Sequence, residues 1–257
     1  MLPEPIFLNV HMYGIMIAIG LLCAFVCLFL YSKKKGIPEK FVDFVFYDAI
    51  ASIVIGFGAA TVIQSFYNFL ANPSGGFHMN LGQGMTFMGG LLGGVICFFA
   101  IYFIFRNKLT GRVYTIFSIA PCCILIGHAF GRIGCFFAGC CYGRAATGAI
   151  EWLGVTFPKV GHVLPTQLYE AAFLFIMFAI CSFLLLKFNF RYNLSVYLIS
   201  YGVFRFLIEY LRGDPRGSFI PGVSPSQFWS FFMVGGGIAL IFVLKNILKK
   251  EEQRALK

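Results

Sequence analysis

Residues 114–137, YTIFSIAPCCILIGHAFGRIGCFF, decide the class of fold. The stretch is mostly apolar and is long enough to cross the ~30 Å hydrocarbon core of a bilayer as a helix. It nevertheless contains His128 and Arg132. Because ionisable side chains are costly inside a membrane and usually mark function, this stretch predicts both a membrane-spanning helix and a site.

The same pattern recurs along the chain, which is 59% hydrophobic and only 12% charged, about half the charged fraction of a soluble domain. We therefore expect an all-α membrane protein, a bundle of about seven transmembrane helices that forms one domain over residues 1–257. The N-terminus lacks the basic region of a cleaved signal peptide. The expected spans lie near 12–31, 41–70, 86–105, 114–137, 166–187, 194–211 and 226–247, and part of Ser65–Leu70 is expected in the interface.

The net charge of +10 reports topology rather than nucleic-acid binding. Fourteen lysines and arginines fall in the connectors 32–40, 106–113 and 187–193 and in the C-terminal tail, whereas the opposite connectors hold four. The positive-inside rule then places the N-terminus outside and the C-terminus in the cytoplasm. The connector at about 138–165 is expected to be extracytoplasmic, and its length and mixed polarity are typical of a functional loop.

Three ionisable residues inside the spans indicate where chemistry takes place. Arg205 and Glu209 are four residues apart on one helical face, so we expect a salt bridge, which could also serve only to pin helices together. Arg132 has no acidic residue at helical spacing. We expect a lipid phosphate to neutralise it, because guanidinium binds phosphate in a bidentate manner; snorkelling to the interface is the alternative.

Two glycine-rich segments accompany these charges. Small residues let transmembrane helices approach closely, and this alone explains the glycines from Gly89 to Gly94. Residues 131–144 interleave glycines with Arg132 and Arg144. This second pattern favours a backbone cradle for phosphate at the membrane surface.

Six segments, in order, resemble the bacterial prolipoprotein diacylglyceryl transferase family over nearly the whole chain. They are His11–Gly14, Gly84–Gly94, Gly131–Arg144, Leu164–Glu170, Tyr201–Arg212 and Ser224–Gln227. The resemblance implies the family's seven-span fold. It also implies transfer of the diacylglyceryl group of phosphatidylglycerol to the lipobox cysteine of a secreted prolipoprotein, with glycerol phosphate as the leaving group.

The resemblance also assigns expected roles, with no cofactor and no metal. The phosphate clamp would be Arg132 and Arg205, and the hydrogen-bonding or base-assisting groups would be Tyr13 and Tyr201. Membrane lipids, phosphatidylglycerol and the acceptor are the expected partners. The expected substrate-binding residues are Arg132, Gly134, Gly143, Arg144, Glu209, Gly89 and Gly90.

The chain departs from the family pattern at Met88, where the family has histidine, and at Cys135, Ala138 and Cys140, where it has two asparagines and an acid. The acceptor is therefore the open point. A relative with the same lipid donor and another extracytoplasmic acceptor, such as a glycan, is one alternative. A lipid-binding protein without catalysis and a transporter are two others.

Two further features have competing interpretations. His128 lies one turn before Arg132 and is either a general base or a packing residue. Cys135 is expected to form a disulfide with Cys140 or Cys141 on the oxidising side of the membrane. A nucleophilic cysteine that accepts lipid transiently and a metal site are the less favoured alternatives.

Overall fold

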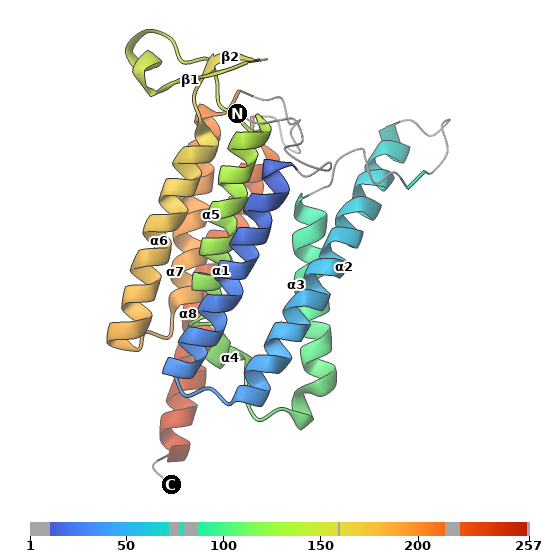
Figure 1. Cartoon of the computed structure of the whole chain (residues 1–257). Coiled ribbons are helices and arrows are strands. Elements are labelled where there is room, and N and C mark those ends of the chain that lie inside the picture. The colour runs from blue at the N-terminus through green and yellow to red at the C-terminus, as the bar shows by residue number, and fades with distance from the viewer. Residues whose placement is uncertain (1–10, 72–77, 80–86, 159, 214–221, 256–257) are drawn as a thin grey trace. The chain divides into compact units, whose positions relative to one another are not determined.

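The computed structural model describes residues 11–71, 78–79, 87–158, 160–213 and 222–255, and it confirms the all-α prediction (Figure 1). Within these residues seven helices are long and apolar enough to span a membrane. They are α1 (Met12–Lys34), α2 (Glu39–Ala71), α3 (Phe87–Phe105), α5 (Ala120–Ala138), α6 (Thr166–Phe188), α7 (Asn193–Ile208) and α8 (Pro225–Ala255). The orientation of the termini across the membrane stays a prediction.

The helices pack as two compact units, residues 35–113 and residues 1–34 with 114–257. In the larger unit α5 packs against α1 and α6, α6 against α7, and α7 against α8 (Figure 1). A Cβ atom on Gly20 of α1 would lie 2.8 Å from the carbonyl oxygen of Gly127 in α5. Glycine at this position therefore lets the two backbones approach closely.

The smaller unit contains α2, α3 and the short helix η2 (Arg106–Lys108). Glycine and alanine form the α2–α3 contact, since a Cβ atom on Gly93 would lie 2.5 Å from that of Ala59. Helix α2 continues without a break through the segment expected in the interface, residues 65–70. At 1.5 Å per residue its 33 residues span about 50 Å, more than one straight crossing requires.

The fourth expected span begins later than the sequence predicts. Residues 113–119 contain only the short helix α4 (Val113–Ile116), and α5 starts at Ala120 with Pro121 in its first turn. Proline suits the first turn because its missing N–H would have no helical partner there. At the other end, Gly139 has φ of 70° and closes the helix in the left-handed conformation.

Asn193, the first residue of α7, ties three segments together. Its side-chain amide donates to the carbonyl oxygen of Cys181 in α6 at 3.0 Å and to that of Ser118 at 2.9 Å. Asn189 makes the preceding turn with φ of 52°. Helices α6 and α7 are thereby joined as a tight hairpin.

The connector at 138–165 has its own structure, at one end of the helices of the larger unit (Figure 1). It contains η3 (Gly148–Leu153) and an antiparallel pair, β1 (Val155–Phe157) and β2 (Gly161–Val163). The backbone N–H of Arg144 donates to the carbonyl of Leu211, in the short helix η4 (Glu209–Leu211) that follows α7. The connector is therefore fixed to the end of α7, while the side of the membrane on which it lies stays a prediction.

Candidate functional site

The carboxylate of Glu170, in the first turns of α6, is the centre of a polar cluster between α5, α6 and α7. The side chain is 1% exposed. Its Oε1 lies 2.9 Å from Nη2 of Arg132 and 3.7 Å from Nε2 of His128, both in α5. The hydroxyl of Tyr201, in α7, donates to the same oxygen at 2.6 Å. One buried carboxylate thus joins three helices.

A second buried ion pair lies in the same unit. Nη1 of Arg205 lies 2.7 Å from Oε2 of Glu209, one turn further along the chain, as the sequence predicts. Nη2 of Arg205 donates to Oγ of Ser226, in the first turn of α8, at 2.6 Å. Arg205 also interacts electrostatically with Glu170. The two ion pairs therefore belong to one cluster, which holds two arginines and two glutamates.

The prediction that a lipid phosphate must neutralise Arg132 was wrong. Glu170 neutralises it. The two residues are 38 positions apart in the sequence and lie in different helices, so helical spacing gave no sign of the pair. The sequence did contain a signal, since Glu170 is an acid near the start of an apolar span. One donor of Arg132 is nevertheless left over, because its Nε is buried without a hydrogen-bond partner among the described residues.

The structure brings two more of the predicted residues to the same end of the bundle. Tyr13 in α1 is 41% exposed and lies within electrostatic range of Arg132 and of the three cysteines 135, 140 and 141. Gly134 lies against it, since a Cβ atom there would be 3.1 Å from Cδ2 of Tyr13. Gly134 is therefore explained by helix packing beside the cluster, and its substrate contact stays a prediction.

Gly143 and Arg144 lie in the connector, outside the polar cluster. A Cβ atom on Gly143 would lie 2.5 Å from the carbonyl oxygen of Leu211, so this glycine allows the connector to approach the end of α7. Arg144 is exposed and lines a shallow depression together with Ala145 and Thr147. Its side chain is thus exposed, and its contact with substrate stays a prediction.

Gly89 and Gly90, predicted to bind substrate, face α2 in the smaller unit. A Cβ atom on Gly89 would lie 2.9 Å from Cδ1 of Ile63, and one on Gly90 would lie 3.3 Å from Cβ of Ala60. Both positions are explained by helix packing, and their substrate role stays a prediction. The side chain of Met88 lies outside the described residues.

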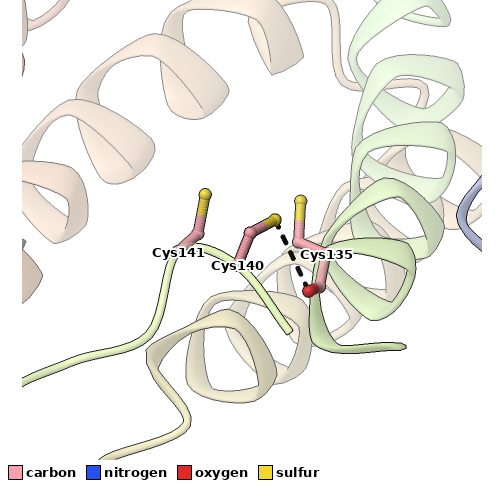
Figure 2. Close-up of side chains that lie close together, drawn as sticks. All are labelled: Cys135, Cys140 and Cys141. Carbon is pink, nitrogen blue, oxygen red and sulfur yellow. Dashed lines mark hydrogen bonds between the residues drawn. The ribbon is translucent and has the colours of Figure 1, made fainter. Parts of the chain in front are cut away.

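Cys135, Cys140 and Cys141 come together where α5 ends, but they form no disulfide, which contradicts the expected bridge. None of the three is bonded to another cysteine, and Figure 2 shows their sulfur atoms on the same side of the chain. The sulfurs lie within 4.8 Å of one another. The Cys140 thiol donates instead to the carbonyl oxygen of Cys135 at 3.6 Å, which directs it along the helix end rather than into a bond with Cys135.

The first turn of α6 holds this cysteine loop in place. The side chain of Gln167 donates to the carbonyl of Cys140 at 2.7 Å, and that of Thr166 donates to the carbonyl of Cys141 at 3.0 Å. Sequence reasoning did not single out either residue, although both belong to the segment Leu164–Glu170 that carries the family resemblance. The same helix turn thus positions Glu170 in the polar cluster and the cysteines at its end.

The surroundings of Cys141 lower the pKa of its thiol. Hydrogen bonds from the Cys135 and Cys140 thiols lower the pKa of Cys141, and the guanidiniums of Arg212 and Arg132 lower it further. The same hydrogen bonding raises the pKa of the Cys140 thiol. Two arginines therefore lie close enough to Cys141 to lower the pKa of its thiol.

The fold and the site together define a multi-pass membrane protein with an ionisable cluster inside its helix bundle. Comparison with known proteins gives the family. The family model for prolipoprotein diacylglyceryl transferase matches residues 4–243. The chain belongs to this family, as the sequence resemblance predicts, and is a multi-pass protein of the bacterial cell membrane.

Individual relatives agree with the family model. The chain is 35% identical over 245 residues to the phosphatidylglycerol–prolipoprotein diacylglyceryl transferase of Clostridium tetani (strain Massachusetts / E88), covering 90% of this chain and 92% of that protein. It is 31% identical to a second transferase of this name from Clostridium perfringens (strain 13 / Type A), covering 95% and 94%. The transferase of Coxiella burnetii (strain Dugway 5J108-111) is 33% identical, covering 83% and 82%. The similarity thus extends over more than four-fifths of each protein.

Proposed function

We propose that this protein is a transferase that moves the diacylglyceryl group of phosphatidylglycerol to the cysteine thiol of a prolipoprotein. The relatives that match most of the chain are named for this activity. The observation that carries the proposal is the buried Arg132, which is held by Glu170 and whose Nε–H has no hydrogen-bond partner among the residues that the structure describes. A fixed guanidinium with a spare donor suits an oxygen of the phosphate that departs.

The reaction requires one bond to form and one to break. The acceptor sulfur attacks the glyceryl carbon that carries the phosphate, the carbon–oxygen bond breaks, and glycerol phosphate leaves with the electron pair. Negative charge on the phosphate grows in the transition state. Preorganised guanidiniums stabilise such charge, because their orientation is fixed before the reaction. Arg132 is oriented by Glu170, and Arg205 by Glu209 and Ser226.

Two further residues of the cluster support this chemistry. His128 lies beside Glu170 and meets the ring of Tyr201 edge-on, with centroids 5.3 Å apart. In this position a neutral imidazole can receive the proton of an acceptor thiol. The Tyr201 hydroxyl donates a hydrogen bond to Glu170, so it acts as a positioning residue that holds the carboxylate against Arg132.

Phosphatidylglycerol with a labelled glycerol headgroup, incubated with the full chain and a lipobox peptide, tests the proposal directly. We expect release of labelled glycerol phosphate and an equal amount of diacylglyceryl peptide, detected by its mass. A matched peptide with serine in place of cysteine is the control and should stay unmodified. Headgroup release without peptide modification would instead identify another acceptor, and no release would refute the proposed function.

Arg132→Ala and Arg205→Ala should each abolish transfer. Loss of one preorganised donor to a developing anion lowers kcat by about 10²–10³-fold. Arg191→Ala is the matched control, because Arg191 is 55% exposed and pairs with Glu251 away from the polar cluster. Activity near that of the unmodified protein in either cluster variant would contradict the phosphate clamp.

A further inference from the structure

The three cysteines at the end of α5 are gathered by the backbone, and this arrangement carries an inference of its own. Cys135 lies in the last turn of α5, Gly139 closes the helix, and Cys141 has φ of 63°. A left-handed backbone is uncommon for residues other than glycine and suggests a function where it is held. Here Thr166 and Gln167 hold it through two hydrogen bonds.

We propose that Cys135, Cys140 and Cys141 bind one Zn²⁺ ion through three thiolates and leave a fourth coordination position for the acceptor thiol. The second half of this inference rests on the proposed function. The geometry needs little change: zinc–sulfur bonds of about 2.3 Å in a tetrahedron place the sulfurs about 3.8 Å apart. The sulfurs already lie within 4.8 Å of one another, and all three point to the same side (Figure 2).

The ligand set favours zinc with an exchangeable position. Thiolates select soft ions, and zinc sites with four protein ligands are structural, whereas those with three are catalytic. Among the described residues no histidine or carboxylate joins the three cysteines in this group. Cys140 is exposed, so an ion and a peptide thiol can both reach the site.

The surrounding charges suit the complex. Three thiolates and one Zn²⁺ ion carry a net charge of about −1. Arg132 and Arg212 both interact electrostatically with Cys141, so cationic groups already lie next to the position of that charge. Arg132 also belongs to the polar cluster around Glu170, and therefore connects the thiolate site with the proposed phosphate clamp.

A thiol that coordinates zinc loses its proton. The acceptor thiol would bind at the fourth position and give up its proton, which the neutral imidazole of His128 would receive as in the proposed function. Its sulfur would then attack the glyceryl carbon as the carbon–oxygen bond to phosphate breaks, and the electron pair would leave with glycerol phosphate. The thioether product is a weak ligand and would dissociate, which returns zinc to its three protein thiolates.

Metal binding is tested on the full chain purified with reductant in detergent, first by its zinc content and then by titration of the metal-free protein with Co²⁺. We expect one metal per chain and sulfur-to-cobalt charge-transfer absorption. Loss of an outer-shell partner alone weakens metal binding by about 10–100-fold. Cys140→Ser removes a direct ligand and should therefore weaken binding at least as much. Cys23→Ser, in α1, is the matched control and should bind as the unmodified protein does. Equal binding by Cys140→Ser, or none by the unmodified protein, would overturn the proposal.

The fourth position is tested by adding lipobox peptide to the cobalt-loaded protein. A cysteine peptide should raise the charge-transfer absorption by about a third, since a fourth thiolate joins three, and the serine peptide should not. No difference between the peptides would overturn this half of the inference. The transfer assay run in parallel separates the two proposals. Metal binding without transfer from phosphatidylglycerol would refute the proposed function, and with it the role of the fourth position, but not the zinc site. Full transfer by metal-free Cys140→Ser would refute the role of zinc alone.

Discussion

Helices α5, α6 and α7 differ from the α2–α3 pair in how they make contact. Helices α2 and α3 meet through small residues such as Gly93 and Ala59. Helices α5, α6 and α7 meet around Glu170 and its donors. Small-residue contacts need only close approach, whereas a buried charge is tolerated only with its partner present. The difference indicates that the polar contact is kept for chemistry and the small-residue contact for packing.

Among the variants that test this comparison, removal of the Glu170 side chain should cause the largest loss of stability. Glu170→Ala leaves Arg132 buried without its counter-ion, and loss of one partner of a buried pair costs about 3–5 kcal/mol. Reversible unfolding in mixed micelles measures the change in the free energy of unfolding. Glu151→Ala, an exposed glutamate of the connector, is the control. Equal stability of the two variants would show that Arg132 does not depend on the carboxylate.

A smaller effect is expected at Tyr201. Tyr201→Phe removes one hydrogen bond to a charged acceptor, worth about 1.5–3 kcal/mol, and should lower kcat because Glu170 loses a positioning contact. Tyr197→Phe is the matched control. Tyr197 stacks on Tyr201 with centroids 5.8 Å apart, and no hydrogen bond of its hydroxyl occurs among the described residues. If both variants keep full activity, Tyr201 has only a packing role.

The smallest effect should come from the small-residue contact. Gly93→Ala places a methyl group against Ala59, and overpacking of this kind costs about 1–3 kcal/mol. Gly58→Ala in α2 is the matched control, because nothing lies within 4 Å of the added methyl group. Melting temperatures of the two variants in detergent give the difference. A Gly93→Ala protein as stable as Gly58→Ala would mean that the α2–α3 contact is loose.

Sequence reasoning found what local patterns encode. Hydrophobic periodicity located the seven spans, and the four-residue spacing identified the Arg205–Glu209 pair. Sequence reasoning failed where an ion pair joins two helices, as with Arg132 in α5 and Glu170 in α6. The spacing of residues within one helix does not show which helices pack together. Sequence reasoning also misjudged the start of α5, since the apolar run continues upstream of Pro121 and gives no sign of the break.

The bonding state of the three cysteines is another feature that the sequence pattern did not predict. Their number and spacing predicted that they would lie close together, which is correct, but they also suggested a disulfide, which the structure does not contain. The bonding state depends on where each sulfur points. Those directions are set by the left-handed turn at Cys141 and by hydrogen bonds from Thr166 and Gln167. Neither feature can be derived from the spacing of the three residues.

The pairing of Arg132 with Glu170 also has a consequence for biogenesis. Arg132 is synthesised 38 residues before its counter-ion, and an arginine at the centre of a helix costs about 2.5–3.5 kcal/mol on insertion into a membrane. Helix α5 is therefore expected to wait at the translocon until α6 arrives, so that the two helices enter the lipid together. Helix α7 follows α6 through the tight turn held by Asn193. A nascent chain stopped before Glu170 should accordingly leave α5 easy to extract from the membrane.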